Sequence, residues 1–404
     1  MASLPLFDLH HRTIKNGDAI AVLRLIRSRK VGPATFHRLM AEHGSAEAAL
    51  DALPHMARGA GIQDYAPCPM GVAEAEMAAG HRAGAKLIAW DDPHYPPQLR
   101  EIAEAPPVLW VKGDMTVLHR LPVAVVGARN ASSLGLRMAR GLALGLAENG
   151  AAVVAGLARG IDTVAHEATL TTGTVAVMAG GIDMIYPSEN AGLAACICET
   201  GLLMTEQPPG TEPVARHFPA RNRIISGLSR AVVVVEAAHR SGSLITAKTA
   251  LDQGREVMAV PGHPMDARAA GCNALIRDGA VLVRNSADVI AALAENGAML
   301  HEQRVVSPAV QPAAKPLQPT AMARRLVDVG RAVLPQSSKR PAQGGPIELE
   351  TRILSMLGPS PTEENLLIRD LGLPAATLAP AILALELSGR VQRISGGKIA
   401  RIGD

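Results

Sequence analysis

The sequence predicts a doubly wound α/β domain with a mostly parallel sheet, between a helical N-terminal domain and a C-terminal winged helix. The central domain is indicated by nine short apolar segments between residues 87 and 285 that alternate with stretches of helix length. Nearly continuous Val-rich strands separated by helices are typical of parallel sheets covered on both faces. We expect domains at residues 1–85, 86–295 and 347–404, with a linker at 296–346.

Composition narrows the possible functions. Aromatic residues make up only 2% of the 404 residues, so the core must be aliphatic, and a nucleic-acid binder built on rows of stacking aromatics is excluded. The net charge of +3 is too small to indicate a partner, so any basic function must come from local clusters. The four cysteines have no metal-ligand spacing and are expected to be buried thiols of a reducing compartment. With no targeting or membrane segment evident, we expect a cytoplasmic protein with no membrane partner and no metal.

The N-terminal domain shows apolar residues at helical spacing over 17–60. Gly32-Pro33 is expected to open one helix, and Gly44-Ser45 to separate it from the next. This pattern indicates a small SAM-like or helix-hairpin-helix module. Such modules contact DNA phosphates through backbone amides, but a purely structural helical cap fits the sequence equally well.

The strands of the central domain are predicted from runs of Val, Ile, Leu and Ala. They are expected at 87–90, 108–113, 123–127, 152–157, 174–181, 202–207, 231–237, 256–262 and 280–285.

The C-terminal part begins with a stretch of different composition. Residues 296–346 hold seven prolines and seven Lys or Arg residues, which predicts a basic tether. From 347 onward the pattern reads as a helix, a helix-turn-helix around Gly372 and a hairpin around Ser395 to Gly397, which is a winged helix. Its second helix, about 375–388, has no Lys or Arg, which favours protein contacts over reading of the major groove.

The first candidate binding segment follows the strand that ends at Gly127. A short polar loop leads into a helix near Ser132 or Ser133, and loop amides with a helix N-terminus form an anion site. Gly127 permits close approach of a ligand, and Arg129 adds a permanent charge. The loop lacks the GxGxxG pattern of dinucleotide binders, and Arg159 stands where such proteins place an acid. An arginine there is suited to the 2′-phosphate of NADP, so that alternative stays open.

A second segment, 156–170, contains His166 and Glu167. The pair does not form a metal-binding HExxH motif because position 170 is Leu. We therefore interpret His166 as a structural histidine.

The strongest local basic cluster spans 216–255, with seven Arg or Lys residues against Glu236 and Asp252. Phe218 lies within this cluster. Its ring is suited to stacking on an unpaired base while arginines bind phosphates. An equal alternative is that the Phe218 side chain packs in the hydrophobic core. After the next strand, Ser241, Gly242 and Ser243 open a second helix, with Lys248 within two turns.

A further strand ends at Pro261-Gly262, and Asn273 is expected near the same edge of the sheet. Open α/β sheets bind ligands at this edge, and several phosphate sites along it suit a polyanion better than one mononucleotide.

These segments together resemble the DNA-processing protein A family (DprA, also called Smf). The similarity rests on GARNAS at 127–132, GLARGIDTVAHEATL at 156–170, GGIDMIYPSEN at 180–190, the run from Phe218 to Ala237, RSGSLITA at 240–247 and VPGHP at 260–264. The long FPARNRIISGLS motif is the most specific of these. The resemblance covers about 100–290 without a break, with weaker similarity in the two flanking domains.

The resemblance implies an extended Rossmann-like domain and a non-enzymatic recombination mediator of natural transformation. Such proteins bind and protect incoming single-stranded DNA, help to load the RecA recombinase past single-strand-binding protein, and typically form a homodimer. No cofactor is implied. The DNA-binding residues that it implies are Gly127, Arg129, Phe218, Arg221, Asn222, Arg223, Gly242, Ser243 and Lys248.

Two departures from the family pattern stand out. Ala128 replaces a common serine, which removes one hydroxyl, and no lysine is evident just before Phe218, where Arg216 is the nearest basic residue. The alternative from another class is a Rossmann-fold nucleotide-binding enzyme, either NADP-dependent or a phosphoribohydrolase. The lack of an acid after the second parallel strand and of any nucleophile–base pair weighs against it.

Overall fold

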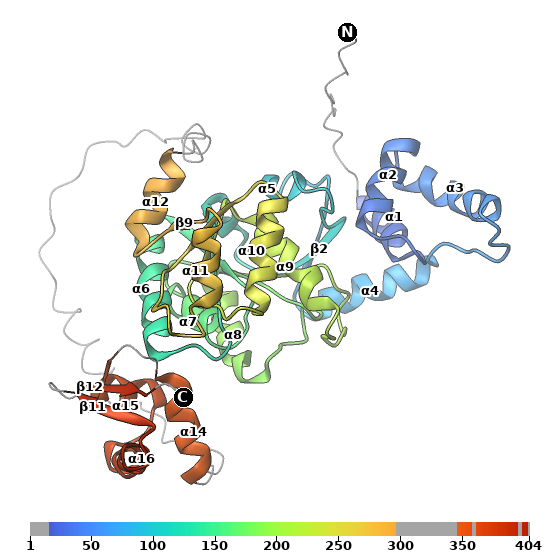
Figure 1. Cartoon of the computed structure of the whole chain (residues 1–404). Helices are drawn as coiled ribbons and strands as arrows, with labels where there is room; N and C mark the ends of the chain where they lie inside the picture. The colour runs from blue at the N-terminus through green and yellow to red at the C-terminus, as the bar shows by residue number, and fades with distance from the viewer. Residues whose placement is uncertain (1–15, 296–345, 358–360, 395–397, 403–404) are drawn as a thin grey trace, which may run out of the picture.

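The computed structural model describes residues 16–295, 346–357, 361–394 and 398–402. In Figure 1 the sheet domain lies in the middle, the N-terminal helices lie at one side, and the winged helix lies beyond α6. The predicted architecture of three folded parts is confirmed. Residues 296–345 of the predicted linker and the predicted hairpin tip at 395–397 lie outside the described residues.

The N-terminal domain consists of four helices. They are α1 (Asn16–Arg27), α2 (Pro33–His43), α3 (Ala46–Gly59) and α4 (Met70–Arg82). As predicted, α2 begins at Pro33 and ends at Gly44, whose φ of 76° is left-handed and is accessible to glycine without strain. The side chain of Ser45 then accepts from the Ala48 amide and caps α3. Leu23, Phe36 and Leu39 are buried in the core of this domain.

The central sheet has nine strands, in the order β1-β2-β6-β5-β4-β3-β7-β8-β9. Their bounds are β1 (Lys86–Ala89), β2 (Val108–Gly113), β3 (Leu121–Val126), β4 (Ala151–Ala155), β5 (Thr174–Val177), β6 (Leu202–Thr205), β7 (Ala231–Val234), β8 (Glu256–Ala259) and β9 (Val281–Leu282). All nine lie where the sequence predicts strands. Strands β3 to β9 pair in parallel with one another. At one edge, β2 pairs antiparallel with β6, and β1 pairs antiparallel with β2.

Helices cover both faces of the sheet, as the apolar strands require. They are α6 (Ser133–Glu148), α7 (Ile161–Ala168), α8 (Ala191–Thr200), α9 (His217–Leu228), α10 (Gly242–Asp252), α11 (Ala270–Arg277) and α12 (Ser286–Glu295), with the short α5 (Pro97–Arg100) and the 3-10 turns η1 (Met115–His119) and η2 (Ser188–Asn190).

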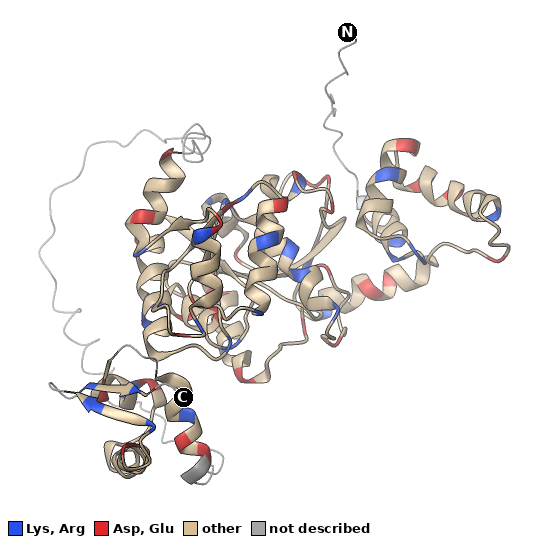
Figure 2. Ribbon diagram, viewed as in Figure 1, with Lys and Arg blue, Asp and Glu red and all other residues tan. Residues whose placement is uncertain are grey.

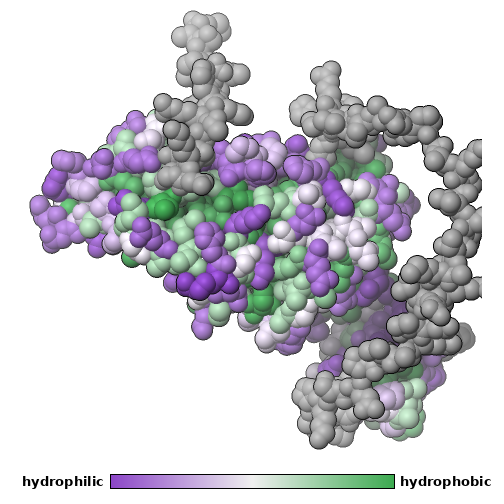
Figure 3. Space-filling model, turned by 180° about the vertical axis from the view of Figure 1, so that it is seen from behind, coloured by the Kyte–Doolittle hydropathy of each residue, from purple (hydrophilic) through white to green (hydrophobic). Residues whose placement is uncertain are grey.

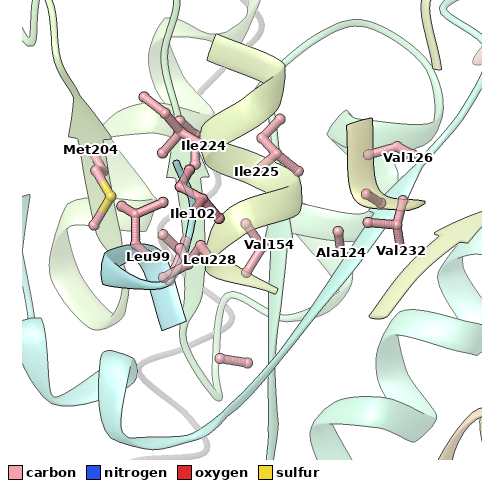
Figure 4. Close-up of a cluster of buried hydrophobic side chains, with 14 of the residues drawn as sticks. Leu99, Ile102, Ala124, Val126, Val154, Met204, Ile224, Ile225, Leu228 and Val232 are labelled. Carbon is pink, nitrogen blue, oxygen red and sulfur yellow. The ribbon is translucent and has the colours of Figure 1, made fainter. Parts of the chain in front are cut away.

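Side chains of successive strand residues pack in two different cores, one on each face of the sheet. Val123 and Val125 of β3 pack in the core under α6, α7 and α12, whereas Ala124 and Val126 pack in the core under α9, α10 and α11. Figure 4 shows part of the second core, where Ile224, Ile225 and Leu228 of α9 lie among Val154, Leu99 and Ile102. This packing fixes α9 on the sheet and so fixes the residues on its other sides.

The winged helix has a core of its own. It is built from α14 (Pro346–Met356), β10 (Thr362–Glu363), α15 (Glu364–Leu371), α16 (Ala375–Leu387), β11 (Val391–Ile394) and β12 (Lys398–Arg401). Gly372, with φ of 63°, makes the predicted turn between α15 and α16. Leu367, Leu378 and Ile382 are buried in its core. Figure 2 shows α16 without blue residues, as expected from a helix that lacks Lys and Arg.

Two of the four cysteines differ from the expected burial. Cys68 and Cys272 are buried, but Cys196 is exposed and Cys198 half-buried, so the expectation of four buried thiols is wrong for these two. They lie on α8, whose inner face is formed by Ala194 and Ile197.

His166 is confirmed as structural. It is buried, with Nδ1 2.8 Å from Thr174 Oγ1, while the Leu157 amide donates to its Nε2 at 3.4 Å.

Within the described ranges, no single helix is long and apolar enough to cross a bilayer, and only α15 with α16, bent by 119°, meets that length and composition as a pair. The face of the molecule in Figure 3 shows hydrophobic and hydrophilic residues interspersed.

Candidate nucleic-acid interface

The candidate site is a cleft at the point where the strand order reverses. Strands β3, β4, β5 and β6 succeed one another in one direction, and β7 returns to the other side of β3. The carboxyl ends of β3 and β7 therefore diverge, which is where open α/β sheets bind ligands. The cleft has a volume of about 610 Å³ and is lined by residues of the loops after β3 and β7, of α9 and of the start of α10.

The loop after β3 brings Gly127 and Arg129 to the cleft, as predicted. A Cβ on Gly127 would meet the Ile161 side chain and lie 3.1 Å from the Glu236 carbonyl oxygen, so the close packing of this loop requires glycine. Arg129 is exposed, and its guanidinium carbon lies 5.2 Å from the centroid of the Phe218 ring. A permanent cation is thus held over an aromatic face at the wall of the cleft.

The start of α6 differs from the expectation of a free anion site. Ser132 caps the helix as predicted, and its hydroxyl accepts from the Gly135 amide at 3.0 Å. However, the Glu236 carboxylate already accepts from the Ser132 amide at 3.0 Å and from the Ser132 hydroxyl at 2.7 Å. The expected phosphate position is therefore filled by the chain's own acid, whose pKa is raised by burial.

Helix α9 turns one face toward the cleft. Phe218, Asn222 and Ile225 line it at intervals of four and three residues, which is the spacing of one helical face. Phe218 is half-buried, meets Tyr186 edge to face with ring centroids 5.7 Å apart, and belongs to none of the hydrophobic clusters in the described residues. Its surroundings therefore match a cleft residue rather than a core anchor.

Arg221 lines the bottom of the cleft but is buried. Its Nη1 donates to the Val177 carbonyl oxygen at 3.0 Å. Burial lowers its pKa to about 10, and the nearby Asp162 opposes that shift. Asp162 is itself buried and accepts from the Gly156 amide at 2.9 Å, and burial raises its pKa. The side chain of Arg221 is thus held in place before any ligand binds.

The second predicted strand-loop-helix site opens onto the cleft. Gly242 and Ser243 line it, and α10 begins at Gly242 with Ser241 as its cap. The Ser241 hydroxyl lies 2.7 Å from that of Ser243 and accepts weakly from the Ser243 amide. Within the described residues, no carboxylate bonds to this helix start, in contrast with α6.

Four predicted site residues do not line the cleft in the described structure. Arg223 is buried on another side of α9, where it pairs with Glu206 and donates to the Glu104 carbonyl. Lys248 is exposed on α10, three residues beyond the lining residue Ile245, and is itself outside the lining. The side chain of Asn273 is hydrogen-bonded to the backbone of Gly262. Its Oδ1 accepts from the Gly262 amide and its Nδ2 donates to the Gly262 carbonyl oxygen, at 3.1 Å each. Arg216 is exposed at the start of α9, outside the lining.

Among the polar lining residues that sequence reasoning missed are Asn130, Arg240 and Arg268. The available signal was position, because Arg240 follows β7, and Arg268 follows β8, at the carboxyl edge of the sheet. With Arg129 and Arg221, the cleft holds four arginines against the single acid Asp162 among its lining residues. Its electrostatic character favours a polyanion.

The residue that motivated the NADP alternative lies elsewhere. Arg159 is exposed and pairs with Glu189 at 2.5 Å, and it is not among the lining residues. In the part of the chain that the structure describes, no group of three His, Cys, Asp or Glu side chains is arranged to hold a metal ion.

Comparisons with known proteins agree with the three-part organisation. Residues 86–294 match the family model described as DNA recombination-mediator protein A. Residues 16–79 match a DprA-like N-terminal HHH domain, and residues 337–397 match a DprA winged helix domain.

Individual relatives give the same result. The chain is 46% identical to the DNA processing protein DprA of Streptococcus pneumoniae, over 50% of this chain and 71% of that one. It is 41% identical to the protein Smf of Escherichia coli, over 67% and 73%. The X-ray structure of DprA from Streptococcus pneumoniae matches with a TM-score of 0.52 and 35% identity, covering 65% of this chain and 98% of that one. This chain therefore belongs to the DNA recombination-mediator protein A family, also called DprA or Smf.

Proposed function

We propose that this protein binds single-stranded DNA in the cleft and acts as a recombination mediator. The observation that carries the proposal is the pairing of Arg129 with the half-buried Phe218 in a cleft with four arginines. Arginines and the amides at the start of α10 contact phosphates, and an accessible aromatic ring stacks on a base. A duplex keeps its bases stacked inside, so the ring favours a single strand.

Family membership supports the finer parts of the proposed role. We infer that the protein protects DNA entering the cytoplasm during natural transformation and loads the RecA recombinase past single-strand-binding protein. The test is RecA filament formation on DNA coated with single-strand-binding protein, with and without this protein. Unchanged filament formation by a preparation that binds single-stranded DNA would contradict the loading role.

We also propose that the protein works as a homodimer. Support comes from the edge strand β9, whose two hydrophobic residues Val281 and Leu282 are both exposed. Exposed hydrophobic edge strands commonly pair with another chain. Sedimentation of the wild type and of Leu282→Lys tests this, and the variant is expected to shift toward the monomer.

The experiment that separates the proposed function from a nucleotide-dependent enzyme is a pair of titrations on one preparation. A labelled oligothymidylate is followed by fluorescence anisotropy, and NADP by calorimetry. We expect saturable binding of the oligonucleotide, no NADP binding and no nucleotide hydrolysis, because the loop after β3 lacks the dinucleotide pattern and Arg159 is outside the cleft. Saturable NADP binding without oligonucleotide binding would reverse the assignment.

A further inference from the structure

Arg268 belongs to two surfaces at once. It follows β8 and lines the cleft together with Arg129 and Arg240. Its Nε donates to Asp266 Oδ1 at 3.2 Å, and Nη2 donates to Asp266 Oδ2 at the same distance. The acid orients the guanidinium, and the remaining donors point away from Asp266 toward other acceptors.

Those acceptors are supplied by the winged helix. Nη1 donates to the Ser355 carbonyl oxygen and Nη2 to the Leu357 carbonyl oxygen, both at 2.6 Å. The two carbonyls lie at the C-terminal end of α14, an eleven-residue helix. A helix C-terminus carries partial negative charge and exposes unpaired carbonyls, so a guanidinium is well suited to cap it.

A second polar contact joins the same two domains. Asp370 of α15 accepts from the Ser133 hydroxyl at the start of α6 and lies 3.4 Å from Arg137 Nη1. Between the two contacts, a cavity of about 80 Å³ remains, lined by Leu134 and Met138 of α6 and by Met356 and Thr362 of the winged helix. The domains thus meet through polar contacts around an imperfectly filled gap, which favours reversible docking.

The docked winged helix contributes no described residue to the lining of the cleft. Docking therefore removes two donors of Arg268 from the cleft and places the negative end of α14 beside it. Both effects disfavour a phosphate at that position.

We propose that Arg268 is a phosphate-binding residue of the cleft that the docked winged helix occupies, so that undocking of this domain strengthens binding of single-stranded DNA. The inference rests on the proposed function of the cleft. By linkage, bound DNA must favour the undocked domain by the same factor.

The test breaks the docking without touching the cleft. In the full-length chain, Asp370→Arg places a cation against Arg137 and should release the domain. Binding of oligothymidylate is expected to tighten on the order of tenfold, about what one charge-assisted hydrogen bond contributes. The salt slope should steepen by about 0.7, the value for one more phosphate contact on a single strand.

Three further variants serve as controls. Glu348→Arg makes the same change of charge at an exposed position in the first turn of α14, away from both contacts, and should leave affinity nearly unchanged. In an Arg268→Ala background, Asp370→Arg should no longer tighten binding. Arg137→Asp combined with Asp370→Arg restores an opposite-charge pair and should return affinity toward the wild-type value.

Small-angle scattering reports the docking itself. The radius of gyration is expected to rise in Asp370→Arg, to fall back in the charge-swapped double variant, and to rise in the wild type when DNA is added. Three results would each overturn the inference. They are a gain in DNA affinity in Glu348→Arg as large as that in Asp370→Arg, weaker DNA binding by Asp370→Arg than by the wild type, or an unchanged radius of gyration in Asp370→Arg. If the wild type does not bind single-stranded DNA at all, it is the proposed function that fails.

Discussion

The guanidinium of Arg221 occupies the space into which a side chain at position 156 would project, so only glycine fits there. A Cβ on Gly156 would overlap Nη1 of Arg221. Gly156 also donates its amide to Asp162, which lies beside the same guanidinium. One glycine thus makes room for a buried arginine and helps to hold the acid that accompanies it.

Gly156→Ala is therefore expected to displace Arg221 and destabilise the fold. Overpacking and disruption of a buried charge should cost at least about 2 kcal/mol in the free energy of unfolding, measured with urea. Gly141→Ala is the matched control, because this exposed glycine of α6 has nothing within 4 Å of an added Cβ. That variant should gain about 0.5–1 kcal/mol. Equal stabilities of the two variants would contradict the packing described here.

Arg129→Ala should weaken binding of single strands of every sequence, because Arg129 is proposed to hold a phosphate rather than a base. The salt slope is expected to fall in magnitude by about 0.7. Arg58→Ala, at an exposed position of α3 in the N-terminal domain, controls for general loss of charge and should leave the slope unchanged. The measurement is anisotropy at several salt concentrations, and an unaltered slope for Arg129→Ala would remove this residue from the site.

Phe218→Ala should act differently, since the ring is proposed to stack on a base. Binding should weaken by roughly 1–3 kcal/mol with little change in salt slope. Because Phe218 is half-buried, the loss of stability should be smaller than that of Phe36→Ala, at a residue only 1% exposed, where roughly 3–5 kcal/mol is expected. A thermal melt beside the titration separates the two roles. A melting temperature as low as that of Phe36→Ala, with unchanged affinity, would make Phe218 a core anchor.

His166 gives a prediction about pH. Burial, assisted by the charge of Arg221, lowers its pKa to about 3 in the folded protein, against 6.5 as its ordinary value. Below pH 6.5 the unfolded chain therefore binds a proton that the folded chain does not, and stability falls as the pH drops toward 3. The contribution is at most about 1.4 kcal/mol per pH unit.

Urea unfolding at several pH values measures this contribution. The difference in stability between the wild type and His166→Asn should shrink on acidification, because only the wild type has to keep this imidazole neutral in the folded state. A difference for His166→Asn that does not depend on pH would mean that the imidazole is not kept neutral by the fold.

Much of the fold was predictable because its determinants are local. Runs such as 231–234 are apolar at every position, which is typical of a strand covered on both faces. Helices α2 and α6 begin at Pro33 and Ser133. Both starts were predictable because proline and serine have an intrinsic preference for the first positions of a helix. Cys196 could not be assigned to the surface in the same way, since exposure depends on which side of α8 meets the sheet.

The candidate site was predictable only in part, for a physical reason. Phe218 and Asn222 share a helical face that spacing alone suggests, but Arg223 in the same motif points to Glu206, a partner 17 residues away in the chain. Helix α6 begins where the sequence predicts it, yet the acid that bonds to its start, Glu236, comes from the loop after β7, 104 residues away. Long-range partners of this kind are set by the order of strands in the sheet, which the sequence does not state.

The measurement that tests the central claim most directly is the affinity for a single-stranded oligonucleotide and for its blunt duplex, at roughly 50 and 200 mM salt. We expect clearly tighter binding of the single strand, and a slope of log affinity against log salt near −3 to −4, as roughly four to six phosphate contacts would give. Equal affinity for the duplex, or an affinity that does not change with salt, would contradict the assignment of this cleft to single-stranded DNA.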